Sequence, residues 1–168
     1  MIFDFYFRKP VLIDYVFSII IVAVNFFLFV NNKIAISSKN NSYSLTGDLT
    51  NVSLTMAGFI LTILTVLITF KENSPSESKK ESNTIFNKFF STDYYFESIK
   101  HLKNCIKSIV FIAALGFFLQ IFINEDDHEY FFFYNILGLI VLILSVQRCL
   151  LILSKILTLQ KESHIADL

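Results

Sequence analysis

The sequence lacks tryptophan, has few cysteines and carries no excess of positive charge. Its 168 residues include no Trp, two Cys, and 14 basic side chains against 14 acidic ones. Two cysteines outside a C-x-x-C motif are too few for a disulfide framework. A net charge of zero gives no support to nucleic-acid binding through bulk positive charge. The aromatic content consists mainly of 20 phenylalanines, whose rings carry no polar group and suit a lipid-facing surface.

The sequence also lacks the motifs of the common enzyme classes. It contains no Walker loop, no G-x-G-x-x-G, no H-E-x-x-H and no nucleophile elbow. His128 lies in an acidic turn, but a short run of adjacent polar residues is more often solvated than metal-binding. His101 has no His, Cys or acid at catalytic spacing. We therefore expect no enzyme activity, no catalytic residue, no metal and no cofactor.

Long apolar segments dominate the sequence, in which 54% of residues are hydrophobic and 17% charged. A helix needs about 20 mostly apolar residues to cross the hydrocarbon layer. Four segments qualify, at about 11–30, 52–70, 105–123 and 131–153. Backbone groups cannot stay unpaired in lipid, so each segment should be helical. The predicted fold is all-α, with residues 1–168 forming one integral-membrane bundle of four transmembrane helices.

The basic residues predict how the chain is oriented. If the N-terminus is cytoplasmic, all but two of the 14 basic residues, Lys33 and Lys39, fall on the cytoplasmic side or at that end of a helix. The positive-inside rule therefore predicts that both termini are cytoplasmic. We expect a multi-pass protein of the bacterial inner (cytoplasmic) membrane, in contact with lipid.

The connections differ in character. Residues 31–50 are rich in Asn and Ser and are expected to form a mobile polar connection. The cytoplasmic connection, 71–104, contains an amphipathic segment at about 85–103 whose apolar stripe continues into the third span. This predicts a third helix with a cytoplasmic extension. The segment is a candidate docking surface for a cytosolic partner, although it also suits packing on the protein's own inner face or on lipid. The candidate docking residues are Phe86, Phe89, Phe90, Tyr95, Lys100 and Lys103.

The second span carries a stripe of small and polar residues. Steps of three and four residues separate Asn51, Thr55, Gly58, Thr62, Thr65 and Thr69. Such a stripe suits close helix packing, in which each hydroxyl bonds to a carbonyl of its own helix or of a neighbour. It also suits the wall of a water-filled pore, within the bundle or at the centre of an oligomer. Packing is the favoured interpretation, because no residue of the stripe is ionisable.

Three ionisable residues lie within the predicted spans. Charges in a span usually face protein or water and pair with one another. Asp14, Arg148 and Lys107 should lie at similar depth near the cytoplasmic ends of their helices. We predict an ion pair between Asp14 and Arg148, with Lys107 as the alternative partner. Lys107 is equally suited to extend its ammonium to the lipid headgroups.

The four spans, the Lys-rich inner connection and the stretch NVSLTMAGFILT at 51–62 resemble small multi-pass membrane proteins of bacterial phage-defence loci. Within that group the chain is most similar to the membrane accessory proteins of type VI-B CRISPR systems. The resemblance implies an oligomeric protein that modulates antiviral RNA interference through a pore or membrane perturbation, with a cytosolic effector as a possible partner. Two alternatives stay open: a non-enzymatic subunit that docks a cytosolic partner in a transport or signalling complex, and a holin-like or channel-forming protein.

Overall fold

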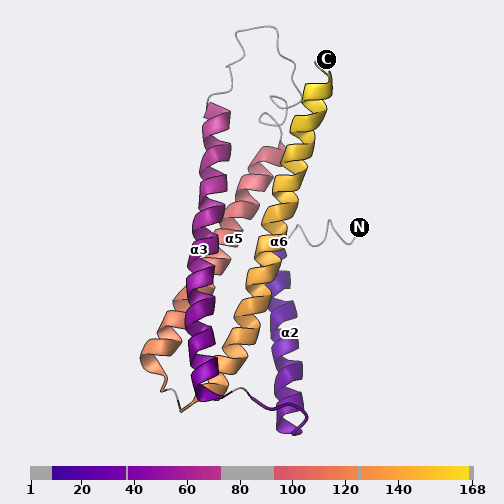
Figure 1. Ribbon diagram of the computed structural model, residues 1–168. Coiled ribbons are helices and arrows are strands. Elements are labelled where there is room, and N and C mark those ends of the chain that lie inside the picture. Colours follow the sequence, from indigo (N-terminus) through magenta and orange to yellow (C-terminus); the bar gives the residue numbers. More distant parts are fainter. Residues whose placement is uncertain (1–8, 37, 73–92, 125, 167–168) are drawn as a thin grey trace.

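The computed structural model describes residues 9–36, 38–72, 93–124 and 126–166. These residues form four long helices, α2 (Pro10–Val30), α3 (Lys39–Glu72), α5 (Asp93–Phe122) and α6 (His128–Ala166). Each helix is long and apolar enough to cross a membrane, as the sequence predicts. The fold is therefore all-α, and the protein is a multi-pass membrane protein with four packed helices. In Figure 1, α2 runs beside the lower part of α6 only, while α3, α5 and α6 extend further upward.

Helix α2 is the shortest of the four and the least covered. Its 21 residues begin with Pro10, which suits a first helical turn because its missing N–H needs no partner there. Only Pro10, Asp14 and Ser18 are buried, at steps of four residues, so a single narrow stripe faces the other helices. A helix of this length measures about 31 Å, close to the thickness of the hydrocarbon layer. We therefore use residues 10–30 as the reference for the depth of the hydrocarbon layer along the other helices, and call this reference the gauge.

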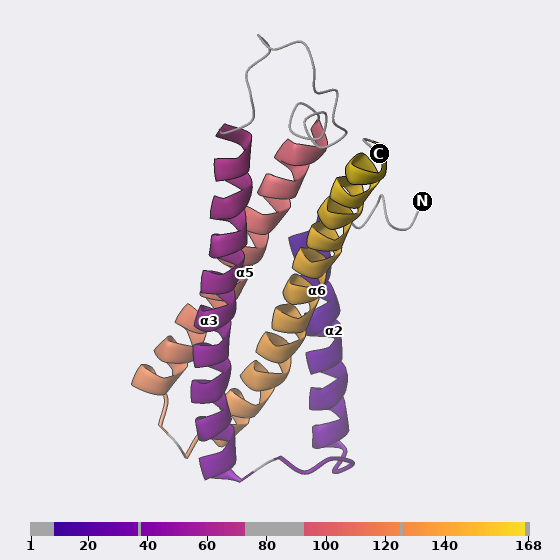
Figure 2. The ribbon, with the colours of Figure 1, turned by 45° about the horizontal axis from the view of Figure 1, so that its top comes forward.

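Side-chain contacts align α5 and α6 with this gauge. Asp14 of α2 forms an ion pair with Arg148 of α6, and the Tyr15 hydroxyl hydrogen-bonds with Ser108 of α5. Helix α6 is antiparallel to α2 and α5 is parallel to it, as Figure 2 shows. Counting along each helix from these contacts, residues 10–30 lie level with 103–123 of α5 and with 132–152 of α6.

The same counting places α3. Thr46 Oγ1 donates a hydrogen bond to Asn135 Oδ1 at 2.9 Å, which sets residues 43–63 of α3 level with α2. The predicted span at 52–70 starts nine residues after this level and lies wholly within α3. The predicted polar connection at 31–50 is wrong from Lys39 onward, because α3 begins there.

The physical reason is that the polar residues early in α3 face protein. Ser42, Thr46, Thr50 and Ser53 are all buried, with exposures of 1% or less. They recur at steps of three and four residues, so they all lie on one side of α3. A hydropathy pattern cannot distinguish such residues from a solvated loop, and it moves the apparent start of the span toward the apolar run that follows.

We call the end of the bundle where α2 begins the Pro10 end, and the opposite end the Val30 end. Helices α3, α5 and α6 continue beyond the gauge at the Pro10 end. There α5 starts at Asp93, ten residues before the level of Pro10, and α6 continues to Ala166. The packing in this region is apolar and includes the buried side chains of Leu64, Leu67, Tyr95 and Leu102. The predicted orientation makes the Pro10 end cytoplasmic, and that orientation stays a prediction.

Candidate functional site

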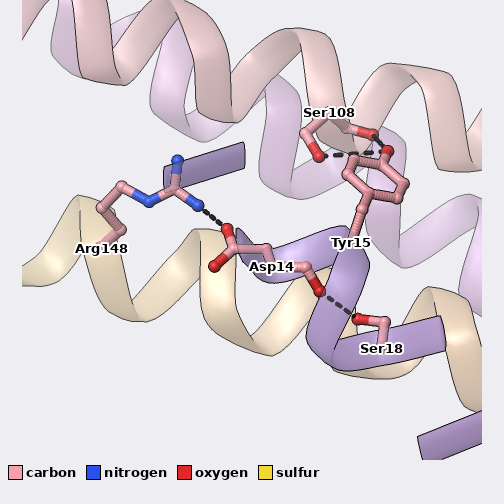
Figure 3. Close-up of polar contacts among 5 residues, drawn as sticks. All are labelled: Asp14, Tyr15, Ser18, Ser108 and Arg148. Carbon is pink, nitrogen blue, oxygen red and sulfur yellow. Dashed lines mark hydrogen bonds and ion pairs between the residues drawn. The ribbon is translucent and has the colours of Figure 1, made fainter. Parts of the chain in front are cut away.

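A buried ion pair lies inside the bundle, between Asp14 of α2 and Arg148 of α6 (Figure 3). The carboxylate Oδ2 faces the guanidinium Nη2, and each residue is only 1% exposed. Asp14 is four residues from Pro10, which places the pair about 6 Å inside the Pro10 end of the gauge. Two charges at this depth need each other, since either one alone in an apolar surrounding is costly.

The structure brings together two of the three ionisable residues that the sequence singled out. Lys107, the alternative partner, is exposed on α5 and lies outside the Asp14–Arg148 pair. Its neighbour Ser108 is the residue that turns inward, toward Tyr15. One step along the helix thus separates a buried hydroxyl from an exposed ammonium.

Hydrogen bonds around the pair fasten α2 to the bundle. Ser18 Oγ donates to the backbone carbonyl of Asp14 at 2.7 Å, within α2. The Tyr15 hydroxyl donates to the Ser108 carbonyl at 3.5 Å, and Ser108 Oγ donates to the Tyr15 oxygen at 3.3 Å (Figure 3). Together with the ion pair, these contacts connect α2 to α5 and α6. Across the described residues, no three His, Cys, Asp or Glu side chains are grouped as a metal site would need.

A second polar network joins α3, α5 and α6 nearer the Val30 end. Asn135 accepts a hydrogen bond from Thr46 and donates one to the Ser42 carbonyl at 2.9 Å. The Tyr134 hydroxyl donates to the Ile112 carbonyl of α5 at 2.6 Å. Asn135 was not among the candidate site residues. Its partners were hidden because they fell in the segment predicted as a loop.

Gly116 of α5 allows this network to close. A Cβ atom at this position would overlap Thr50 Oγ1 and would lie 2.6 Å from the Tyr134 hydroxyl. The glycine therefore lets α3 and α6 approach the backbone of α5. Small residues at helix interfaces in membranes have this effect.

The threonine stripe of α3 lies on the outside of the bundle. All six of its residues, Asn51, Thr55, Gly58, Thr62, Thr65 and Thr69, are exposed. The buried side of α3 instead contains Ser53, Ala57, Ile60, Leu64 and Leu67. The favoured interpretation, a packing seam, is therefore wrong for contacts within one chain. Helix α3 carries small or polar residues on two opposite sides, and periodicity alone does not say which side meets the neighbouring helices.

The exposed hydroxyls are satisfied within α3 itself. Thr55, Thr62, Thr65 and Thr69 each donate to the carbonyl four residues earlier, at 2.9–3.1 Å. A Cβ atom added to Gly58 would meet nothing within 4 Å. This side of the helix is thus open and lacks the tight contacts that surround Gly116.

The polar face continues past Asn51 to Asp48, which the sequence analysis left in the loop. Asp48 is exposed and precedes Asn51 by three residues, so it extends the same series. Residue 43 is level with the Val30 end of the gauge. Asp48 lies five residues, or about 7.5 Å, inside this end, and Asn51 lies about 12 Å inside the same end. A carboxylate and an amide therefore point outward at the depth of the hydrocarbon layer. The sequence could have indicated Asp48 as a member of the stripe, because Asp48 precedes Asn51 by a helical step of three residues.

The predicted docking residues divide into three groups. Tyr95 is only 4% exposed and belongs to the apolar core, with Lys71 Nζ 4.6 Å from its ring centre. Its prediction as a docking residue is wrong, because the start of α5 turns this ring toward α3. Lys100 and Lys103 are exposed. The other three, Phe86, Phe89 and Phe90, lie outside the described residues.

Comparisons with family models, with curated proteins and with solved structures found no match to this chain.

Proposed function

We propose that this protein is a non-enzymatic membrane protein whose copies assemble through the exposed polar face of α3. We define this face by Asp48, Asn51, Thr55, Gly58 and Thr62. In this proposal the assembly acts in the bacterial inner membrane as an accessory or effector of antiviral defence. The assembly part is carried by one observation, the outward polar face at the depth of lipid, and the defence part by the resemblance to phage-defence membrane proteins.

Lipid is a poor neighbour for this face. Threonine hydroxyls can bond to their own helix, as they do here, and so tolerate an apolar surrounding. The Asn51 amide has two donors and an acceptor, and the Asp48 carboxylate carries charge, so both need water or another protein surface. Another copy of the chain presents the same polar face, which lets each copy cover its neighbour's.

The polar face has the composition of a channel wall. Arranged around a common axis, several copies would place rings of Asp48 near one end, Asn51 below them and threonine hydroxyls beyond. Acidic rings favour cations in known pores. The contrast with α2 supports this interpretation, because the exposed side of α2 presents Phe17, Ile20 and Phe27 instead.

The test uses single cysteines at Asn51 and Thr55 in a background with Cys105→Ala and Cys149→Ala. Leu139 and Ile143 of α6 are exposed and lie within one residue of the same depths, so Leu139→Cys and Ile143→Cys are the matched controls. In intact membranes, a pore wall predicts that Asn51→Cys and Thr55→Cys react with a small charged thiol reagent, whereas the controls do not.

Oxidative cross-linking separates the two forms of assembly. Cross-linked dimers through Asn51→Cys without reagent labelling would indicate a dry packing interface between copies. Neither cross-linking nor labelling above the controls would show that the face does not assemble, and the proposal would be wrong.

The defence part has its own test. The chain is expressed with an RNA-targeting effector, and phage plating and membrane potential are measured with and without infection. We expect a change in phage plating that the Asn51→Leu variant abolishes. Depolarisation without any effect on phage would favour a channel without a defence role.

A further inference from the structure

The outward side of α5 carries a series of lysines. Lys100, Lys103 and Lys107 are all exposed and follow one another at steps of three and four residues, so they share one face of the helix. The same face continues toward the Val30 end through exposed apolar residues at the same steps, namely Val110, Ala114, Phe117 and Ile121. One surface of α5 thus changes from apolar to basic along its length.

The alignment of the helices places the change at the edge of the bilayer. Ser108 of α5 lies level with Tyr15 of α2, because the two residues are hydrogen-bonded. Lys103 precedes Ser108 by five residues, and Pro10 likewise precedes Tyr15 by five residues. Lys103 therefore lies level with the Pro10 end of the gauge. Lys107 lies about 6 Å inside that level and Lys100 about 4.5 Å beyond it. The three ammonium groups span the headgroup layer.

A fourth positive charge lies beside this face. Lys71, at the end of α3, holds its Nζ 4.2 Å from the ring centre of Phe96, and Phe96 precedes Lys100 on the same face of α5. Glu97 is the exposed acidic side chain between Phe96 and Lys107, and it precedes Lys100 by three residues, so it offsets one of the four positive charges. The basic patch therefore comes from two helices and keeps an excess of positive charge.

We propose that this patch, formed by Lys100, Lys103 and Lys107 with Lys71 at its outer edge, is a binding site for an anionic phospholipid. The phosphodiester lies among the ammonium groups of Lys100, Lys103 and Lys107, and the acyl chains follow Val110 and Ala114 along α5. Charge complementarity and the unbroken connection to the apolar face both fit a lipid, whose head and tails meet at this depth. A soluble protein would have to reach Lys107 inside the hydrocarbon boundary, so lipid is favoured over a cytosolic partner.

The absence of tryptophan permits a direct test. The variant Val110→Trp places a single reporter on the proposed acyl-chain path, about 10 Å inside the level of Pro10, and Ile143→Trp places one within about 3 Å of the same depth on exposed α6. Each variant is reconstituted in vesicles with phosphatidylcholine or phosphatidylglycerol carrying bromines midway along its chains. Quenching of each reporter gives the relative association constant of the two lipids. Because the vesicles are symmetric, the result does not depend on the orientation of the chain.

We expect phosphatidylglycerol to bind beside Val110→Trp at least about fivefold more tightly than phosphatidylcholine, and the two lipids to bind equally tightly near Ile143→Trp. Replacing Lys100, Lys103 and Lys107 with Gln should bring the ratio at Val110→Trp to about one, since each lysine near an anionic surface contributes a factor of this size. Replacing them with Arg should keep it.

The matched control removes the same charge elsewhere, through Lys9→Gln, Lys33→Gln and Lys155→Gln. This variant should keep the lipid preference at Val110→Trp. A preference that survives the Gln substitutions on α5, or that falls equally in the control, would overturn the proposal. Equal binding of the two lipids in the unsubstituted patch would also overturn it and would assign the lysines to a soluble partner.

Discussion

Removing one member of the Asp14–Arg148 pair should destabilise the bundle more than removing both. Both side chains are at least 99% buried, so either one left alone keeps a charge without its counter-ion. Breaking a buried pair in this way costs about 3–5 kcal/mol. We therefore expect Asp14→Asn and Arg148→Met each to lower the free energy of unfolding by about that amount.

The double variant tests the reasoning. With no charge left, the remaining cost is the buried Asn amide, about 1–3 kcal/mol, so the double variant should be more stable than either single one. The assay is reversible unfolding from mild detergent into dodecyl sulfate, followed by far-ultraviolet circular dichroism. Lys107→Met removes a charge from the exposed neighbour and should change stability by less than about 1 kcal/mol. If the losses of the two single variants add in the double variant, the pair makes no coupled contribution and the argument fails.

Three further predictions follow from the packing and the connections. Gly116→Ala should lower the free energy of unfolding by about 1–3 kcal/mol in the same assay, because its Cβ overlaps buried atoms, whereas Gly58→Ala, which meets nothing within 4 Å, should be neutral in the monomer. Asn135→Leu leaves buried hydrogen-bonding groups of α3 without their partner and should cost about 1–3 kcal/mol, and unchanged unfolding would contradict this account. Asp126 hydrogen-bonds to Lys39, whose charge also lowers the pKa of Asp126 below its ordinary 3.8, so this contact stabilises the fold above that pH and is lost as pH falls through the lowered pKa. A carboxyl titration by NMR should show that Lys39→Gln returns the pKa of Asp126 to its ordinary range.

The apolar runs were sufficient to predict four membrane-spanning helices, because a continuous apolar segment of this length has one common solution in lipid. The runs at 11–30, 105–123 and 131–153 coincide with parts of α2, α5 and α6 to within one residue. Helix α3 begins earlier than the sequence predicted because Ser42, Thr46 and Thr50 meet other helices, and polarity alone does not reveal a partner 89 residues away such as Asn135.

Long-range contacts also decided which residues of the candidate site could be predicted. Asp14 and Arg148 could be named from the sequence because charges in spans are few and tend to pair. The direction in which the stripe of α3 faces could not, because both sides of that helix repeat small residues at helical steps. Only the positions of α5 and α6 distinguish Ala57, which is buried, from Gly58, which is exposed.

The two sides of α3 place different demands on the sequence. The inner side needs small residues, since Thr50 lies directly against Gly116 and Ala57 is buried further along the same side. The outer side has no such need in a single chain, where bulky apolar residues like those of α2 would make more favourable contacts with lipid. The folding of one copy therefore does not explain Asn51 or the threonines that follow it. Contacts between copies would explain them, and they would make the stability of the assembly, unlike that of the monomer, sensitive to substitution at Gly58.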